Sequence, residues 1–335
     1  MEASTKHHTD TFEDNWTMQR VAVIGSSSMG TLLAAVLGQV CPVIVVSRNT
    51  ERASSLFRDG VRCTGHIQCN SHPVVVRSCA DIPAAGGADV VFVATKTTAI
   101  PSIAAELAPV LRASSRNDRS AHVVSFQNGI EPGEQLMSLM PECQVLRMVL
   151  TLGVSLEEEN GCTAAHIHTN QPPHAIGGPT TLDRHVSEHI AAALTRGGLD
   201  TQHTDAIDQA VWKKAIVNAA MNPVAALVNC TVGEVLDSPA FDVVIRLLRE
   251  GIEVATAEGI ELGASFEQHA IETMQGARDH TPSMVEDIRK GRESEVGQLN
   301  RQIIRHASST SLCVPTHEIV NGLIETFDWK AYKEV

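Results

Sequence analysis

The chain has 335 residues, of which 43% are hydrophobic and 19% charged, an ordinary globular composition that excludes a fibrous or disordered protein. At roughly 100–200 residues per domain, this length predicts two domains. Acidic side chains outnumber basic ones 39 to 26, for a formal net charge of −13. This balance argues against a nucleic-acid partner, because proteins that bind nucleic-acid phosphates concentrate Lys and Arg.

Residues 1–19 are expected to form a flexible tail, since they are polar and lack both the apolar core of a secretion signal and the Arg-rich face of a transit peptide. Residues 215–233 carry no charge but include three asparagines and a proline, so no membrane span is expected. The eight cysteines show no C-x-x-C pair, which predicts reduced thiols and a cytoplasmic protein. No spacing among the 15 histidines predicts a metal site, so no metal is expected.

Strand and helix patterns alternate in the first part of the chain. The apolar run Val21–Ile24 stops at Gly25, and a helical pattern of small residues runs from Met29 to Leu37. Such alternation is typical of a parallel sheet covered by helices on both faces, so residues 20–203 are expected to form a Rossmann-type α/β domain. Further buried strands are expected at 43–46, 90–94, 122–126 and 145–150, antiparallel strands at 166–168 and 175–176, and exposed loops at 113–120 and 157–160.

The strand pattern disappears after about residue 200, and the rest of the chain has helical periodicity. Residues 204–335 are therefore expected to form a second, all-α domain. Its helices are expected at 207–221, 240–258, 265–275, 283–290 and 296–307.

A degenerate G-x-G-x-x-G turn follows the first strand and begins the first helix. In a dinucleotide-binding fold such a turn brings backbone N–H groups and the helix N-terminus to the pyrophosphate. A plain strand-to-helix turn is the alternative, because Ser27 replaces the middle glycine and its Cβ limits backbone approach. The candidate cofactor-binding residues of this turn are Gly25, Ser26, Ser27, Ser28, Met29 and Gly30.

Polar residues follow three of the predicted strands, at the edge where open α/β sheets bind ligands. Arg48 follows the second strand, with Arg52 one turn on, and a cation there favours the 2′-phosphate of NADP(H) over NAD(H). Lys96 and Asn128 follow two later strands and are candidate cofactor contacts. Each alone is more often a turn residue, and an Arg48 exposed to solvent is the alternative to a phosphate contact.

Three polar residues recur at every fourth position in an otherwise apolar helical pattern. Lys214, Asn218 and Asn222 therefore lie on one helix face. Buried polar groups need partners, so this stripe predicts either a polar network with another helix or a polar ligand. A lysine in a partly apolar cleft is suited to donate a proton to a carbonyl oxygen while hydride arrives from a nicotinamide.

Two further candidates lie in the C-terminal third. Ser283 and Glu286 have the S-x-x-E spacing of a capping box at a helix start, a position that also favours carboxylate binding. Glu295 by itself is expected to be an exposed helical glutamate.

Together these segments resemble the ketopantoate reductase (2-dehydropantoate 2-reductase) family, over nearly the whole chain from about residue 20 to 328. The resemblance is carried by the turn at 25–30, Thr95-Lys96, Gln127-Asn128-Gly129, the motif W-K-K-x-x-x-N-x-x-x-N-P at 212–223 and the segment PSMVEDIRKGRESEV at 282–296. It implies NADPH-dependent reduction of a small 2-keto acid by a Rossmann domain and a helical domain that closes over the cleft. The expected partners are that acid and, in a homodimer, a second copy of the chain.

The resemblance also implies roles for the candidate residues. By this resemblance, Lys214 looks like the general acid. The expected substrate contacts are Asn218, Asn222 and Ser283. Glu295 is similar to the acid that orients the lysine and touches the cofactor. Lys96, Asn128 and Arg48 are similar to cofactor contacts near the nicotinamide, the ribose and the 2′-phosphate.

Three positions depart from the family pattern: Ser27, Val232 where a substrate-binding asparagine is frequent, and Arg301 where a small residue is usual. Loss of a polar contact at 232 changes which substrate fits, so a paralogue that reduces another 2-keto acid is the first alternative. A non-catalytic NADP sensor with the same fold is the second. The pair Lys214 and Glu295 argues against a sensor.

Overall fold

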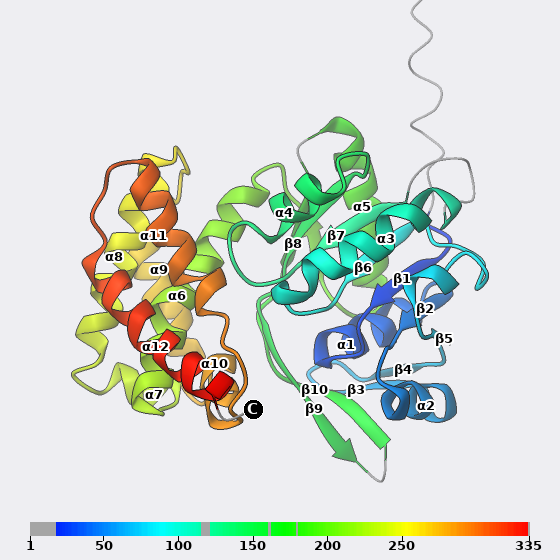
Figure 1. Cartoon of the computed structure of the whole chain (residues 1–335), viewed down its shortest axis with the longest axis horizontal. Coiled ribbons are helices and arrows are strands. Elements are labelled where there is room, and N and C mark those ends of the chain that lie inside the picture. The colour runs from blue at the N-terminus through cyan, green and yellow to red at the C-terminus, as the bar shows by residue number, and fades with distance from the viewer. Residues whose placement is uncertain (1–17, 115–120, 160–161, 179, 334–335) are drawn as a thin grey trace, which may run out of the picture.

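The computed structural model describes residues 18–114, 121–159, 162–178 and 180–333. The predicted tail lies almost wholly outside these residues, and so does most of the loop expected at 113–120. The described chain forms an α/β part and a helical part that lie side by side (Figure 1). The predicted combination of a Rossmann-type sheet and an all-α region is confirmed.

An eight-stranded sheet forms the centre of the α/β part. All neighbouring strands run parallel except β8 and β11. Because β1 lies between β2 and β6, the strand order reverses at β1, and open sheets bind ligands at this switch point. The spatial order is β12 (Thr201–His203), β11 (His174–Gly177), β8 (Val145–Val149), β7 (His122–Ser125), β6 (Val90–Val93), β1 (Val21–Ile24), β2 (Val43–Val46) and β5 (Val74–Val76).

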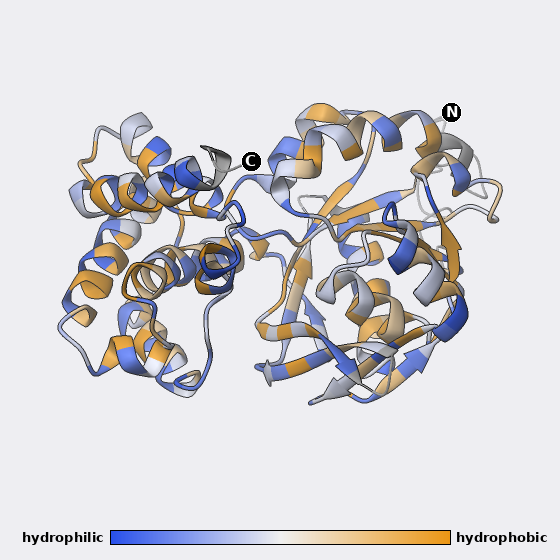
Figure 2. Ribbon diagram, turned by 60° about the horizontal axis from the view of Figure 1, so that its bottom comes forward, coloured by the Kyte–Doolittle hydropathy of each residue, from blue (hydrophilic) through white to orange (hydrophobic). Residues whose placement is uncertain are grey.

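Helices cover both faces of this sheet. One face packs against α3 (Ile100–Ser114) and α4 (Pro132–Leu139), and the other against α1 (Ser28–Leu37) and α5 (Thr181–Arg196). The central strands are apolar at every position because both faces are buried, and the helices are apolar on the inner side (Figure 2). The remaining elements of this part are α2 (Thr50–Asp59), η1 (Cys79–Asp81) and η2 (Thr97–Ala99).

A second, four-stranded sheet packs against α1 on the side away from the large sheet. Its order is β4 (Cys69–Ser71), β3 (Val61–Gly65), β10 (Cys162–Asn170) and β9 (Leu152–Glu159). The strand expected at 166–168 therefore belongs to this sheet and not to the large one. The prediction of an acidic loop at 157–160 is wrong for residues 157–159, which form the end of β9. This sheet is half exposed, so its strands can carry charged side chains.

Most helices predicted for the second part are confirmed, with shifted ends. Pro223 does not end α6, which continues to Val228 and stops at Asn229 with a left-handed φ of 56°. Two helices, α7 and α12, were not predicted. The helical elements are α6 (Ile207–Val228), α7 (Val232–Leu236), α8 (Phe241–Ala257), α9 (Phe266–Gly276), α10 (Ser283–Arg289), η3 (Val296–Gln298), α11 (Asn300–Ser309) and α12 (Pro315–Lys333).

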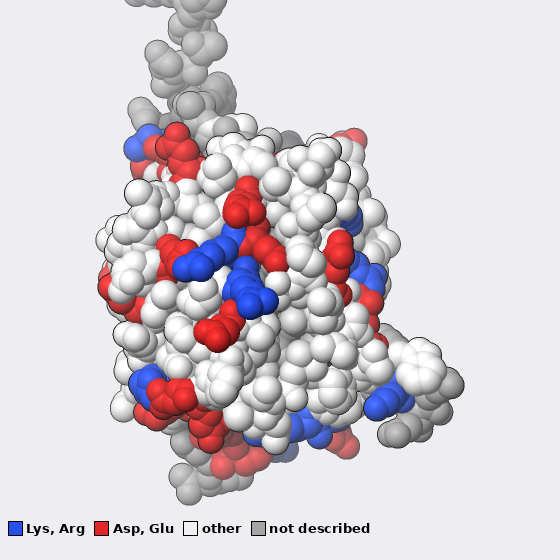
Figure 3. Space-filling model, turned by 90° about the vertical axis from the view of Figure 1, so that its left-hand side faces the viewer, with Lys and Arg blue, Asp and Glu red and all other residues white. Residues whose placement is uncertain are grey.

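The surface of the helical part mixes charges of both signs. Figure 3 shows acidic and basic side chains side by side on this face, with no broad basic area of the kind that nucleic-acid phosphates require. None of the helices in the described ranges combines the length and the hydropathy needed to span a lipid bilayer.

A buried histidine joins four helices of this core. His317 of α12 is fully buried; its Nε2 donates to the carbonyl oxygen of Leu247 on α8 at 3.0 Å. Its Nδ1 accepts from Asn300 Nδ2 of α11 at 3.1 Å, and the same amide donates to Ala219 of α6 at 2.9 Å. These bonds fix the neutral imidazole, and burial lowers the pKa of His317 to about 4.

The low pKa of His317 predicts an acid-sensitive fold. Below the ordinary histidine pKa of about 6.5, the unfolded chain takes up a proton that the folded chain refuses until about pH 4. The free energy of unfolding should fall by about 1.4 kcal/mol per pH unit in this window, to a total of roughly 3 kcal/mol. Urea titrations of His317→Gln should show a shallower decline than those of the exposed control His269→Gln; equal slopes would contradict this assignment.

Candidate functional site

Two glycines bring the start of α1 against the end of β6. Gly25 has a φ of +107°, and a Cβ there would lie 2.8 Å from the carbonyl oxygen of Ala94. A Cβ on Gly30 would lie 2.1 Å from the carbonyl oxygen of Gly25. Both positions therefore exclude side chains, and the helix N-terminus lies at the switch point between β1 and β6, where anions bind favourably.

The serines of the turn are bonded within the protein. Ser27 is the N-cap of α1: its Oγ accepts from the N–H of Gly30 at 3.5 Å and donates to the carbonyl oxygen of Ala94 at 3.1 Å. Ser26 Oγ lies 2.8 Å from Ser47 Oγ. The serine in place of the middle glycine thus has a local role, and its hydroxyl is not a free donor for a phosphate.

Three arginines surround the carboxyl end of β2. Arg48 is half exposed and pairs with Glu106 of α3 at 2.5 Å. Arg52 lies against the turn: its guanidinium donates to the carbonyl oxygen of Ser26 at 3.4 Å and to Thr31 Oγ1 at 2.8 Å, and burial lowers its pKa. Arg77, which the sequence patterns did not single out, donates to Thr50 Oγ1 at 3.0 Å and to the backbone of Arg48.

Two residues of the α/β part bond across to the helical part. Lys96 Nζ lies 3.4 Å from the buried carboxylate of Asp287 on α10 and 3.3 Å from the carbonyl oxygen of Glu293. Asn128 Nδ2, after β7, donates to Glu295 Oε2 at 2.9 Å. The structure thus brings Asn128 and Glu295 together, although 167 residues separate them, and ties Lys96 to α10.

Buried polar atoms without partners lie beside these two residues. Thr95 Oγ1 precedes Lys96 and Gln127 Nε2 precedes Asn128, and neither has a hydrogen bond within the described chain. Buried polar atoms are normally bonded, so a polar ligand at the switch point would complete both. Sequence reasoning noted these residues only as parts of motifs; their burial at strand ends is visible only in the fold.

The side chain of Lys214 is held away from bulk water near the sheet ends. Burial lowers its pKa from 10.5 to about 8; the carboxylate of Glu295 opposes the shift and the guanidinium of Arg147 adds to it. The ammonium is thus close enough to both groups, and to His174, for their charges to interact. A lysine with this pKa keeps its proton at neutral pH and releases it more readily than an exposed lysine.

Asn218 and Asn222 share the face of α6 with Lys214, as the spacing predicted. Each of the three residues is partly exposed, although the ammonium of Lys214 itself is desolvated, and within the described residues none of the three side chains forms a hydrogen bond. The alternative of a polar network with a partner helix therefore finds no support in these residues. The stripe presents one ammonium and two amides for a polar ligand.

The capping box predicted at Ser283 is wrong. Pro282 is the N-cap of α10 and Ser283 its first helical residue, without a side-chain cap bond, while Glu286 pairs with Lys290 at 2.8 Å. The hydroxyl of Ser283 is exposed, and its helix packs against α6.

Val232 lies at the start of α7 and is 4% exposed, inside the core of the helical part. An asparagine at this position would therefore bury an amide unless it met a ligand.

Arg147 is a buried cation that sequence reasoning missed. It lies on β8 among apolar neighbours and donates to the carbonyl oxygens of Ile130 at 2.8 Å and Gly129 at 3.4 Å. Burial lowers its pKa to about 10. It positions the turn after Asn128 and favours deprotonation of Lys214; the only sequence signal was one arginine in an apolar strand.

Two sequence profiles match the chain. The profile described as "Ketopantoate reductase PanE/ApbA" covers residues 21–178, and that described as "Ketopantoate reductase PanE/ApbA C terminal" covers residues 206–328. The 2-dehydropantoate 2-reductase of Halobacterium salinarum is 28% identical over 315 residues, which are 91% of this chain and 97% of the relative.

Solved structures share the fold. The PanE/ApbA family ketopantoate reductase of Ralstonia eutropha superposes with a TM-score of 0.81 at 24% identity, over 94% of this chain and 100% of that one. A D-mandelate dehydrogenase in complex with NADH and anilino(oxo)acetate superposes with a TM-score of 0.80 at 18% identity, over 94% and 99% of the two chains.

The electrostatics of Lys214 predict the effect of removing Glu295. Glu295→Gln removes a carboxylate that stabilises the ammonium, so the pKa of Lys214 should fall below about 8. Amine-selective labelling followed by mass spectrometry at a series of pH values should place the labelling midpoint of Lys214 at lower pH in Glu295→Gln. The matched control Glu293→Gln removes an exposed carboxylate and should leave the midpoint in place; an unchanged midpoint in Glu295→Gln would contradict the pairing.

Proposed function

Because the chain belongs to the ketopantoate reductase family, which consists of pyridine-nucleotide-dependent oxidoreductases, we propose that it reduces 2-dehydropantoate to pantoate with NADPH and uses Lys214 as proton donor. The observation that carries this proposal is the desolvated ammonium of Lys214 beside Glu295, on a helix face with two free amides.

The residues of the switch point fit a dinucleotide. Gly25 and Gly30 let the start of α1 pack directly against the end of β6, and the partnerless Thr95 Oγ1 and Gln127 Nε2 lie at the adjacent strand ends. The turn at 25–30 would hold the pyrophosphate, and Lys96 and Asn128 would contact the nicotinamide half. Bound NADPH supplies the hydride.

The side chains of the helical part supply the proton and the substrate contacts. Lys214 donates a proton to the carbonyl oxygen, and its positive charge stabilises the developing alkoxide. Asn218 and Asn222 hold hydroxyl and carbonyl groups of the substrate, and the exposed hydroxyl of Ser283 binds its carboxylate. Glu295, held by Asn128, keeps the lysine protonated and oriented.

The role of Lys214 predicts a large loss of turnover in Lys214→Ala. Removing a positioned general acid costs typically 10²–10⁴-fold in rate, so kcat should fall by roughly this factor while NADPH still binds. Loss of NADPH absorbance with 2-dehydropantoate measures turnover. The matched control Lys213→Ala removes the neighbouring lysine of α6 and should retain nearly full activity.

Results other than this loss of turnover would favour a different function or a different role for Lys214. Full turnover by Lys214→Ala would refute the proton-donor role. NADPH binding without turnover of 2-dehydropantoate, but with turnover of another 2-keto acid, would favour a paralogue, an alternative that the buried Val232 supports. NADPH binding without turnover of any 2-keto acid would favour the sensor.

The arginines at the end of β2 support NADPH over NADH. Arg48 and Arg52 are the cations nearest in sequence to the site of a 2′-phosphate. A charge-assisted hydrogen bond contributes about 1.5–3 kcal/mol, so Arg48→Ala should weaken NADPH binding by roughly 10–100-fold and leave NADH binding unchanged. Fluorescence titration with both nucleotides tests this; a parallel loss for NADH would contradict it. Glu106→Gln, which frees Arg48 from its ion pair, should tighten NADPH binding.

We also propose a homodimer and a cytoplasmic location. Ile319, Leu323 and Phe327 lie four residues apart on α12 and are 65%, 49% and 39% exposed, an apolar stripe that a second copy would cover. Light scattering should give about twice the monomer mass, and Leu323→Lys should halve it; a monomeric native chain would contradict the dimer. The location rests on six cysteines that are free thiols, as in a reducing compartment, and cell fractionation tests it. They are Cys41, Cys63, Cys69, Cys79, Cys230 and Cys313.

A further inference from the structure

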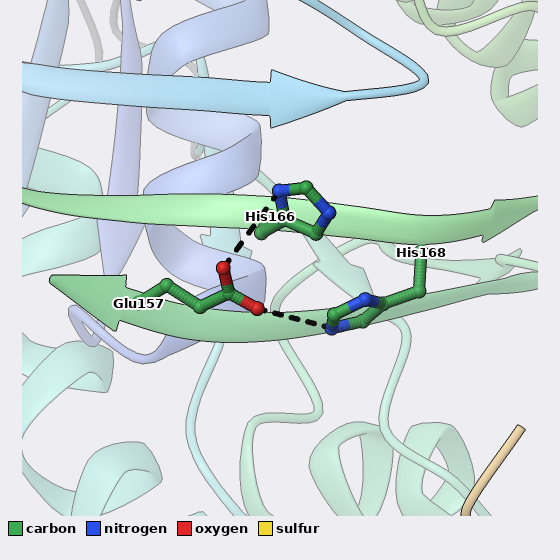
Figure 4. A group of neighbouring side chains, drawn as sticks. All are labelled: Glu157, His166 and His168. Carbon is green, nitrogen blue, oxygen red and sulfur yellow. Dashed lines mark ion pairs between the residues drawn. The ribbon is translucent and has the colours of Figure 1, made fainter. Parts of the chain in front are cut away.

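A carboxylate and two imidazoles converge on the small sheet. His166 and His168 lie on β10, where His168 is the unpaired residue of a β-bulge, and Glu157 comes from the neighbouring antiparallel strand β9. Figure 4 shows the carboxylate of Glu157 between the two rings. Its Oε2 lies 3.9 Å from His166 Nδ1 and its Oε1 3.6 Å from His168 Nε2.

These distances are close to those of a metal site. One ligand atom from each residue lies within 4.8 Å of the other two. Bonds of roughly 2.1 Å place tetrahedral ligands about 3.4 Å apart, so the side chains need to close by about 1 Å. The three side chains are 30–43% exposed, so an ion can reach them from solvent and they have room to rotate.

We propose that Glu157, His166 and His168 form a binding site for a divalent transition-metal ion, with water at the remaining position. Two imidazoles and one carboxylate suit Zn²⁺ and its neighbours in the first row better than Mg²⁺ or Ca²⁺, which prefer oxygen ligands. The site lies on the small sheet, which carries none of the residues proposed for reduction.

The neighbours of the cluster set the cost of binding. Ser155 Oγ lies 2.7 Å from His168 Nε2, and Thr64 Oγ1 lies 2.9 Å from His166 Nδ1. Both hydroxyls must release these nitrogens when an ion binds. The backbone of the two strands does not need to move, because the ligand atoms are near the ends of side chains.

Zn²⁺ binding to the purified, untagged full chain tests the proposal. Competition with a chromogenic chelator should give one equivalent bound through these residues, and the thermal midpoint of unfolding should rise with Zn²⁺. Glu157→Gln should weaken binding by more than the roughly 10–100-fold that a lost outer-shell partner costs. Glu158→Gln makes the same charge change on the adjacent residue of β9 and should leave the affinity unchanged.

A second pair of variants guards against adventitious histidine binding. His166→Gln/His168→Gln should abolish the site, whereas His185→Gln/His189→Gln removes two neighbouring histidines of α5, whose ring centroids are 4.4 Å apart, and should retain it. Circular dichroism verifies that each variant is folded. Absence of Zn²⁺ binding, equal binding by Glu157→Gln and the native chain, or loss only in the α5 variant would each overturn the proposal. Failure here leaves the proposed reduction untouched, because that is assayed without added metal.

Discussion

The structure of the proposed site depends on one ammonium group held out of bulk water between a helical core and the ends of a parallel sheet. Burial lowers the pKa of Lys214 and Arg147 adds to that effect, whereas the carboxylate of Glu295 opposes it and favours the charged ammonium. That carboxylate is in turn held by Asn128, at the end of β7. The charge state of a residue in one part of the molecule therefore depends on a strand end in the other.

The two parts are joined by the same kind of contact elsewhere. Lys96 meets the buried carboxylate of Asp287, and Gln302 Oε1 accepts from the N–H groups of Ile130 and Glu131 at 2.6 and 3.2 Å. Charged and amide groups make these contacts, beside the apolar packing of Val149 against α6 and of Ile130 against the helical core. Such contacts fix orientation strongly because their geometry is directional.

The sequence allowed the core of the fold to be predicted, because its pattern has one physical cause. Val21–Ile24 and Val90–Val93 are apolar throughout since both faces of the sheet are covered. The half-exposed strands β4 and β9 were missed, since Cys-Asn-Ser and a run of glutamates have the composition of loops. The stripe of α6 was predictable because helical spacing alone determines it. The pairing of Asn128 with Glu295 was not, because it depends on packing between distant segments.

The residue spacing of a capping box leads to a capping box at one helix start of this chain and not at another. Ser283 and Glu286 have the spacing of a capping box, yet the structure forms none there, whereas Thr231 and Glu234 form one that was not predicted. The difference is local: Pro282 takes the N-cap position, and Lys290 engages Glu286. The cluster of Glu157, His166 and His168 was not predictable from histidine spacing, because the pairing of β9 with β10 brings the carboxylate to the two rings.

The contacts of Arg52 have a consequence for the affinity of the proposed phosphate site. Its guanidinium is already bonded to Ser26 and Thr31, so the rotamer entropy of this long side chain is lost when the chain folds. An incoming phosphate is then spared about 0.5–1.5 kcal/mol of ordering cost at this residue. A preorganised cation improves affinity without any additional contact, and it does so at the expense of the stability of the empty protein.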